Sequence, residues 1–288
     1  MSNSGDGWAE GPDGTRMWGL FGAAGLVAHD PDRGILLQHR APWSHYGDTW
    51  GIPGGARNLD ETPVRAALRE SFEEAAVPQD AVCPRFTYVR DLGFWKYTTV
   101  IARVTTPFEA HMNDNESHQL AWVAVNELER LRLHPGFALA WPTLRPLLDA
   151  RVEIIVDVAN VMGSRPDGWW KDRAGGARRV VAEISPIAAD GCPASLFGLD
   201  VATAWPRVTF VVEGAARPVS EACASEPGVR IRAAAGSGDD EVVAAIEPGM
   251  TTLVVTSDRE LRARAEALGA RTIGAGAFRS AMGFSKSS

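Results

Sequence analysis

Apolar residues along the first half of the chain come in short runs rich in β-branched and aromatic residues, and turn-forming residues separate these runs. Runs of this length are typical of strands, so the pattern predicts strands at residues 20–29, 35–40, 86–92, 95–103 and 120–125. The Asp, Pro and Gly residues at 30–34 predict a turn between the first two strands. A short helix is expected to begin at residue 126. The first half therefore reads as a sheet with few helices.

One longer segment, residues 63–75, departs from the strand pattern because it is rich in Ala, Arg, Leu and Glu. These residues favour a helix, with Thr62 as its N-cap and a proline at its first position. Glu70, Glu73 and Glu74 then fall on one face of that helix. Carboxylates this close repel one another unless a cation lies among them, so the spacing predicts a site for Mg²⁺ or Mn²⁺. The alternative is an ordinary solvated helix face.

Neighbouring residues extend this prediction. Gly54 and Gly55 are expected to form a loop whose backbone approaches the ion closely, because glycine has no side chain to prevent it. Arg69 is expected to pair with Glu61 or Glu73 and to hold the carboxylates in place.

The spacing of these residues resembles the Nudix box, Gly-x5-Glu-x7-Arg-Glu-U-x-Glu-Glu-x-Gly-U, in which U is a bulky apolar residue. In this sequence the pattern runs from Gly55 to Val77, and the preceding Trp-Gly-Ile-Pro-Gly-Gly also fits the family. The resemblance covers residues 17–148. It implies an α/β/α sandwich with a mixed sheet, in a domain that spans residues 1–148.

The resemblance also implies an activity, a Mg²⁺-dependent or Mn²⁺-dependent pyrophosphohydrolase that cleaves a nucleoside diphosphate linked to another group. The implied catalytic residues are Arg69, Glu70, Glu73 and Glu116, and the implied metal ligands are Gly54, Glu70, Glu73 and Glu74. Either Glu70 or Glu116 would take the proton from the attacking water. Glu116 belongs to a polar stretch at residues 113–117, for which a simple loop tip is the alternative.

Two positions depart from the family pattern. Ser71 replaces a bulky apolar residue, which is expected to weaken the packing of the helix. Ala76 replaces the closing glycine, and a left-handed cap at that position would cost alanine about 1 kcal/mol. Neither residue is a ligand, so the departures are expected to affect local stability more than chemistry.

Two further residues are expected to bind the substrate. Arg40 ends a strand just before residues 41–48, and in the family such a loop lines the substrate cleft; an ordinary surface arginine is the alternative. Trp50 precedes the box, and for this residue the alternative is a place in the core.

After residue 149 the pattern changes to a regular alternation of strands and helices. Apolar strand runs lie at residues 152–157, 208–213, 229–234 and 252–256, and helix patterns lie at 169–184, 239–246 and 259–268. This alternation predicts a second domain, residues 151–288, with a mainly parallel sheet.

Acidic residues stand where the strands of this second sheet are expected to end, and chemistry gathers at that edge of a parallel sheet. These acids are Asp157, Glu213, Asp240 and Asp258. Converging carboxylates would bind a hard cation. Acids at strand ends also serve as helix N-caps, which is the alternative for Asp239, Asp240 and Asp258.

The motifs at residues 156–161, 238–242 and 254–261 resemble the NYN branch of the PIN-like nucleases, which implies a Rossmann-like fold. By that resemblance, Asp157, Asp240 and Asp258 would bind Mg²⁺ or Mn²⁺ for phosphodiester cleavage, and Asn160 would orient a metal-bound water or a phosphate. Further candidates for this site are Glu213, Asp239 and Asp172. A domain that has lost catalysis and binds RNA or mediates assembly is the alternative.

Composition supports two domains and limits the possible partners. The chain has 288 residues, 45% of them hydrophobic, which is enough for two cores. There is no apolar run near the ~20 residues of a membrane span and no secretory signal, and the three spaced cysteines suit buried thiols. We therefore expect a cytoplasmic protein without a membrane partner. A net charge of −7 excludes tight non-specific binding to nucleic acid by charge alone.

Two functions remain open at this point. The chain is either a nucleotide pyrophosphohydrolase with an added PIN-like domain, or an RNA-processing protein. In the second case the Nudix-like half would serve as a module that binds nucleotides or RNA ends. The sequence selects neither the nucleotide nor the oligomeric state.

Overall fold

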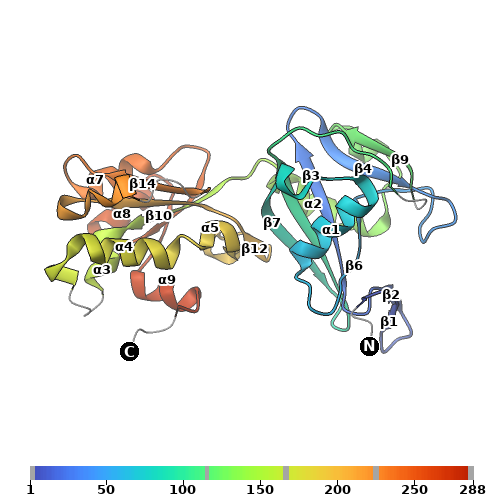
Figure 1. Ribbon diagram of the computed structural model, residues 1–288, viewed down its shortest axis with the longest axis horizontal. Helices are drawn as coiled ribbons and strands as arrows, with labels where there is room; N and C mark the ends of the chain where they lie inside the picture. The colour runs from blue at the N-terminus through green and yellow to red at the C-terminus, as the bar shows by residue number, and fades with distance from the viewer. Residues whose placement is uncertain (1–3, 114–116, 165–168, 223–226, 285–288) are drawn as a thin grey trace. The chain divides into compact units, whose positions relative to one another are not determined.

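The computed structural model describes residues 4–113, 117–164, 169–222 and 227–284 (Figure 1). The chain divides into two compact units, Met1–Asp149 and Ala150–Ser288. Each unit has its own sheet and its own helices, and each is described separately below.

The first unit is built on a sheet in which the strands follow the order β7-β8-β3-β4-β5, with β6 also on β3 and β9 also on β4. Strands β3 and β8 are parallel and the other pairs are antiparallel, so the mixed sheet expected from the sequence is confirmed. The strands are β3 (Ala23–Asp30), β4 (Gly34–Arg40), β5 (Trp50–Gly51), β6 (Gly54–Ala56), β7 (Val82–Asp91), β8 (Lys96–Val104) and β9 (Ser117–Val123). A separate hairpin consists of β1 (Trp8–Glu10) and β2 (Arg16–Trp18).

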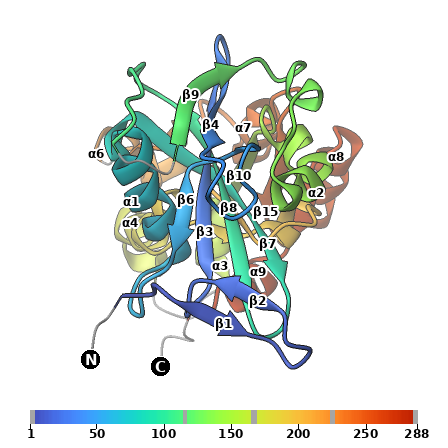
Figure 2. The same cartoon turned by 90° about the vertical axis from the view of Figure 1, so that its right-hand side faces the viewer.

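Helix α1 (Pro63–Ala75) packs on the sheet through its small residues. Ala66, Ala67 and Ala75 are fully buried against apolar side chains of β3, β4 and β8. Thr62 caps the helix by accepting from the backbone N–H of Arg65, as expected. Small residues on the buried face allow a close approach of helix and sheet, and Figure 2 shows α1 lying along β6 and β3.

The two departures from the box pattern are both tolerated at the end of α1. Ser71 is fully buried, and its hydroxyl donates to the carbonyl of Ala67 at 2.6 Å, so its polar atom is satisfied in the core. Ala76 has φ 54° and ψ 31°, which is the left-handed conformation. Its N–H donates to the carbonyls of Phe72 and Ser71.

The end of the first unit differs from the sequence-based expectation. The helix predicted from residue 126 is only a turn followed by the 3₁₀ segment η2 (Leu128–Arg130), and the longer helix α2 (Pro135–Leu144) follows it. His134 caps α2, because its Nδ1 accepts from the N–H of Gly136 at 3.1 Å. Two short 3₁₀ segments complete this unit, η1 (Gln79–Ala81) and η3 (Arg145–Leu147).

The second unit contains a parallel sheet with the strand order β14-β13-β10-β15-β16. Its strands are β10 (Val152–Asp157), β13 (Arg207–Val212), β14 (Val229–Ala233), β15 (Thr251–Val255) and β16 (Arg271–Ile273). The mainly parallel sheet expected from the sequence is therefore confirmed. A short antiparallel pair, β11 (Cys192–Pro193) and β12 (Thr203–Ala204), lies outside this sheet.

Helices cover both faces of this parallel sheet, with α7 and α8 on one side and α3 and α4 on the other (Figure 1). The helices are α3 (Val158–Gly163), α4 (Arg173–Ile184), α5 (Ile187–Asp190), α6 (Val219–Ala222), α7 (Gly238–Ala245), α8 (Arg259–Ala267) and α9 (Ala275–Ala281). The 3₁₀ segments are η4 (Trp169–Lys171), η5 (Ala194–Phe197) and η6 (Gly214–Ala216). The single helix expected at residues 169–184 is divided into η4 and α4, because Asp172 caps α4.

A buried ion pair connects the first two strands of this sheet. The Glu153 side chain on β10 is 1% exposed and accepts two hydrogen bonds from the guanidinium of Arg207 on β13, at 2.8 and 2.7 Å. The hydroxyl of Thr209 donates to the same carboxylate at 2.6 Å. The charge is therefore buried with its partners, which avoids the large cost of an unpaired charge in the core.

The cysteines only partly match the expectation of buried thiols. Cys192 is buried, which raises the pKa of its thiol to about 12, whereas Cys83 is exposed on β7. Cys223 lies outside the described residues. None of the helices within the described ranges has the length and apolar character that a bilayer span requires.

The left-handed Ala76 generates the first prediction. Replacing Ala76 with glycine removes the steric cost of this conformation and should raise the free energy of unfolding by about 0.5–1 kcal/mol. The measurement is a urea unfolding curve with an unchanged slope and a higher midpoint. A lower midpoint would contradict the assignment of strain to this residue.

His134 generates the second prediction. Burial and the nearby positive charges of Arg40, His45 and Arg90 lower the pKa of His134 to about 4. Between this value and the unfolded pKa near 6.5 only the unfolded chain binds the proton, so stability is lost as the pH falls through that window. In His134→Asn, which can still cap α2, the loss between pH 6.5 and 4 should be smaller by on the order of 2 kcal/mol. Urea unfolding curves of the two proteins at several pH values measure this. If the free energy of unfolding depends on pH equally in both proteins, the prediction is contradicted.

Candidate functional site

Arg69 is the centre of the first candidate site. Its Nε and Nη2 each donate to one oxygen of Glu61, both at 2.9 Å. Its Nη1 donates to Glu70 at 2.8 Å and to Glu73 at 3.0 Å, and its Nη2 also bonds the carbonyl of Ala56 at 3.0 Å. One guanidinium therefore joins three carboxylates of the box to strand β6. The expected pairing of Arg69 with Glu61 or Glu73 is confirmed, and it includes both partners.

The carboxylates around Arg69 differ in their affinity for protons. Hydrogen bonds from Arg69 lower the pKa of Glu61. Burial raises the pKa of Glu70 despite its contact with Arg69, and the charge of Glu73 raises it further. Glu70 therefore keeps a proton to a higher pH than an ordinary glutamate does, which is a common property of carboxylates in reaction centres.

Gly54 and Gly55 lie in strand β6 and not in the loop that we expected. A Cβ on Gly54 would fall 2.4 Å from the carbonyl oxygen of Ala24 on β3, and one on Gly55 would fall 2.5 Å from a carboxylate oxygen of Glu70. The N–H of Gly54 donates to the carboxylate of Glu74 at 2.8 Å. The glycines thus allow close approach, as expected, but what approaches them is β3 and the glutamates of α1.

These residues fit a hard divalent cation in their chemistry, because all the side chains that could bind it offer carboxylate oxygens. Arg69 contacts Glu70 and Glu73, and the N–H of Gly54 contacts Glu74. Over the ranges that the structure describes, no group of three or more acids, histidines or cysteines is already arranged to hold an ion. Arg69 bonds one oxygen of Glu70 and one oxygen of Glu73, so each carboxylate can keep that bond and offer its other oxygen to an ion. Glu116 lies outside the described residues, so its two predicted roles stay predictions.

The loop at residues 41–48 of the first unit is held in an unusual backbone conformation. Tyr46 and Asp48 have φ values of 55° and 62°, which are uncommon for residues other than glycine. The Thr49 hydroxyl donates to the Tyr46 carbonyl at 2.6 Å, and Arg40 Nε donates to the carbonyl of His45 at 3.1 Å. Strain of this kind is common in loops that contact ligands.

Aromatic side chains gather around this loop, and Trp50 is one of them. The Trp50 ring is stacked on His39, with the ring centroids 4.9 Å apart, and it is half-buried. The ring of Tyr46 contacts His45 and His134, and Trp43 is 71% exposed. The substrate-binding roles of Arg40 and Trp50 stay predictions.

In the second unit, several predicted residues meet at the carboxyl ends of β10 and β15. Asp157 ends β10, where it caps α3 through the N–H of Asn160 and accepts from the Thr256 hydroxyl at 2.9 Å. Asn160 accepts from the N–H of Ser257 at 2.8 Å. The strand order reverses between β10 and β15, and ligands of open α/β sheets bind outside such a point.

Acidic neighbours make this edge of the sheet strongly negative. Burial raises the pKa of Asp157, and the charges of Asp239 and Glu213 raise it further. Burial likewise raises the pKa of Asp239, and the charge of Asp258 raises it further. Carboxylates that raise one another's pKa favour a bound proton or cation among them.

Asp239 and Asp240 are placed differently from the expectation. Asp240 is exposed and forms an ion pair with Arg264 at 2.6 Å. The carboxylate whose charge raises the pKa of Asp157 is that of Asp239. Neither residue caps α7, because Ser237 is the N-cap residue, so the cap alternative is wrong for both. The helix begins at Gly238, and this start turns Asp239 toward the sheet.

The remaining candidates have local partners. Asp258 caps α8 through the N–H of Leu261, so the cap alternative is confirmed for this residue. Asp172 caps α4 through the N–H of Gly175, and Glu213 accepts from the N–H of Gly238 at 2.8 Å. The metal roles of these residues stay predictions, since a capping carboxylate keeps a second oxygen for other contacts.

Two residues of this edge and the backbone conformation of the loop at residues 41–48 were not predicted from the sequence. Thr256 ends the strand predicted at residues 252–256 and Ser257 follows it, so their position at its carboxyl end was a usable signal. The conformation of Tyr46 had no such signal, because residues other than glycine rarely adopt a positive φ.

Known proteins with similar sequences match about half of this chain. The putative 8-oxo-dGTP diphosphatase 3 of Mycobacterium tuberculosis is 46% identical over 155 residues, which is 50% of this chain and 71% of that protein. A nucleoside triphosphate pyrophosphatase/Nudix hydrolase fusion protein of Bifidobacterium longum is 39% identical over 153 residues, which is 50% of this chain and 32% of that protein. The crystal structure of a Nudix hydrolase from M. smegmatis, RenU, is 45% identical to this chain and gives a TM-score of 0.45. The match covers 49% of this chain and 94% of the RenU chain.

The family model of the NUDIX domain matches residues 20–142, which lie within the first unit and include the whole box. The matched segment contains Arg69 and the glutamates that it joins. Together with the extent of the match to the M. tuberculosis protein, this shows that the chain belongs to the Nudix hydrolase family.

Proposed function

We propose that the first unit is a Mg²⁺-dependent or Mn²⁺-dependent pyrophosphohydrolase that cleaves a nucleoside diphosphate linked to another group. The observation that carries this proposal is the convergence of Glu61, Glu70 and Glu73 on Arg69 beside the glycines of β6. The M. tuberculosis relative is named a putative 8-oxo-dGTP diphosphatase. 8-oxo-dGTP is therefore the first nucleoside triphosphate to test.

Glu70, Glu73 and Glu74 would hold the metal. When bound, the ion would stabilise negative charge on the phosphate oxygens and acidify a water molecule. Arg69 holds Glu70 and Glu73 on one side of α1, so their carboxylates remain close together when no ion is present. Its bidentate bond to Glu61 fixes the guanidinium itself, so Arg69 acts as a positioning residue.

The proton of the attacking water passes to a carboxylate. Glu70 is one candidate, because its raised pKa brings its protonation closer to the pH at which a general base works well. Glu116 is the other candidate. Arg40 and Trp50 would contact the substrate from the side of the aromatic loop, where Tyr46 and Trp43 offer exposed rings for a nucleobase.

The third prediction tests the metal-binding carboxylates. Glu73→Gln keeps the size of the side chain and a hydrogen-bond acceptor for Arg69, but removes a charge. Turnover of 8-oxo-dGTP and dGTP with Mg²⁺ should fall by about 100-fold or more, with little change in thermal unfolding. Release of pyrophosphate measures this, and EDTA should abolish the wild-type rate.

Glu129→Gln is the matched control, because Glu129 is exposed and pairs only with Arg145 among the contacts that the structure describes for it. It should keep turnover within about twofold. Near-normal activity of Glu73→Gln would remove the metal assignment, and equal losses in the two variants would show that the effect is not local.

We propose as a second function that the second unit cleaves RNA with Mg²⁺ or Mn²⁺, as a PIN-like nuclease of the NYN branch. The observation that favours it is the position of Asp157, Asp239 and Asn160 at the reversal of strand order in a parallel sheet. In these terms Asp157 and Asp239 supply the charge that binds the ion, and Asp258 lies close to Asp239.

The fourth prediction compares two adjacent residues. Asp239→Asn should lower the cleavage of labelled single-stranded RNA in Mn²⁺ by about 100-fold, whereas Asp240→Asn should leave it within about threefold, because Asp240 is paired with Arg264. Both variants should hydrolyse nucleotides at the wild-type rate, since distant sites act independently.

Three outcomes contradict this second function. The wild-type chain does not cleave RNA, or the two variants lose equal activity, or either variant loses nucleotide hydrolysis. A chain ending at Asp149 provides a further comparison, and it should keep nucleotide hydrolysis if the two units fold separately.

A further inference from the structure

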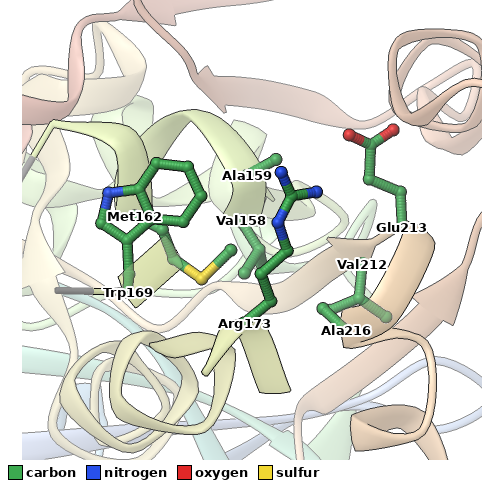
Figure 3. Close-up of a pocket in the computed structure, with 8 residues that line it drawn as sticks. All are labelled: Val158, Ala159, Met162, Trp169, Arg173, Val212, Glu213 and Ala216. Atoms are coloured by element: carbon green, nitrogen blue, oxygen red, sulfur yellow. The ribbon is translucent and has the colours of Figure 1, made fainter. Parts of the chain in front are cut away.

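A pocket of about 180 Å³ opens beside the acidic edge of the second unit (Figure 3). Its walls come from α3, from η4 and the start of α4, and from the end of β13. It adjoins Asp157, because Val158 and Ala159, which line it, follow that residue directly. The pocket therefore lies next to the proposed nuclease site, and of the candidate residues of that site it includes Glu213.

One side of the pocket is flat and apolar. The Trp169 indole and the Met162 thioether form this side, and Val158 lies between them and the polar end (Figure 3). Gly176 on α4 permits this packing, because a Cβ there would fall 2.9 Å from Met162 Sδ and 3.1 Å from Trp169 Cβ. An aromatic face with a thioether beside it suits a flat, polarizable ring.

The other side of the pocket carries two opposite charges. The Arg173 guanidinium lies 5.6 Å from the centre of the Trp169 ring, and Figure 3 shows it pointing into the space between this ring and Glu213. Glu213 accepts from the N–H of Gly238, which fixes its carboxylate at the far end of the pocket. A ligand here meets a cation beside the aromatic ring and a hydrogen-bond acceptor at the far end of the pocket.

We propose that this pocket binds the nucleobase of a nucleotide. The base would stack on Trp169, an amino group on its edge would donate to Glu213, and Arg173 would contact the phosphate. The acidic residues nearby disfavour an anionic ring, whereas a base is neutral and its phosphate can reach Arg173. The volume suits one ring system and is smaller than the usual pocket for a drug-sized molecule.

The same chemistry is offered by a free nucleotide and by one base of a single-stranded RNA. Stacking of bases on aromatic side chains is common to proteins that bind single strands. The role in RNA rests on the second proposed function, but the binding itself does not, because it can be measured without cleavage.

The experiment uses the full chain labelled with 5-fluorotryptophan and followed by ¹⁹F NMR in EDTA. The resonances of Trp169 and Trp170 are assigned by replacing each residue with phenylalanine. GMP, AMP, CMP and UMP are titrated separately, and so are short RNA oligomers of one base. Monophosphates have no phosphoanhydride bond, so the Nudix site cannot consume them.

Saturable movement of the Trp169 resonance is expected, with the Trp170 resonance unchanged. Trp170 is the matched control, because it is adjacent and 58% exposed but does not line the pocket. With affinities measured by isothermal titration calorimetry, because the variant lacks the Trp169 signal, Trp169→Ala should weaken binding by about 5- to 150-fold, the range of base stacking, and Trp170→Ala by less than about twofold. Glu213→Gln should reduce the preference for bases with an amino group over uracil, and Arg173→Ala should weaken binding more than Arg178→Ala on the same helix.

Tighter binding of oligomers than of monophosphates identifies RNA as the source of the base, and equal binding identifies a free nucleotide. The proposal is overturned if no nucleotide moves the Trp169 resonance, or if Trp169→Ala and Trp170→Ala bind equally well. RNA cleavage that persists when binding to Trp169 fails would leave the second proposed function standing without this pocket. Nucleotide binding at Trp169 in a chain that does not cleave RNA would support this pocket and contradict the second proposed function.

Discussion

The first unit depends on the way one guanidinium balances three carboxylates, two of them on α1 and one just before it. Glu61, Glu70 and Glu73 could not lie this close without a compensating charge, and Arg69 supplies it at hydrogen-bond distance from all of them. The bond from Arg69 to the carbonyl of Ala56 connects this cluster to β6 and so to the sheet. The position of the helix on the sheet and the arrangement of its acids are thus coupled.

The second unit meets the same difficulty without such an arginine. The charge of Asp239 raises the pKa of Asp157, and Arg264, although its charge lowers the pKa of Asp239, forms its ion pair with Asp240. Hydroxyl and amide donors from Thr256 and Asn160 orient Asp157 but do not cancel its charge. The two units therefore differ in how the charge of their clustered acids is balanced. In the first unit an arginine compensates it, whereas in the second unit the cluster stays negatively charged.

Much of the first site could be predicted from the sequence because helical spacing fixes which residues share a face. Thr62, the position of α1 and the pairing of Arg69 all followed from local pattern. The strand at Gly54 and Gly55 did not, because glycine favours loops and only the partner strand β3 makes it extended. The helix α2 was also missed in detail, since it contains two prolines, at positions 135 and 142.

The second site shows a different limit of prediction. The strands and the acids at their ends were readable, but the choice between Asp239 and Asp240 was not. One residue along a helix rotates a side chain by about 100°, so a shift of one residue in the start of α7 decides which acid faces the sheet. That start is set by Ser237 and Gly238, and the N–H of Gly238 in turn donates to Glu213, which directly follows β13.

The buried pair of Glu153 and Arg207 has a consequence for how the parallel sheet finds its alignment. Sliding β13 along β10 would still place apolar residues on both covered faces of the sheet, because β13 is buried along nearly its whole length. Such a slip would, however, separate Glu153 from the residue directly opposite, Arg207. An isolated carboxylate in the core is costly, so the ion pair rejects the misalignment that hydrophobicity alone would accept.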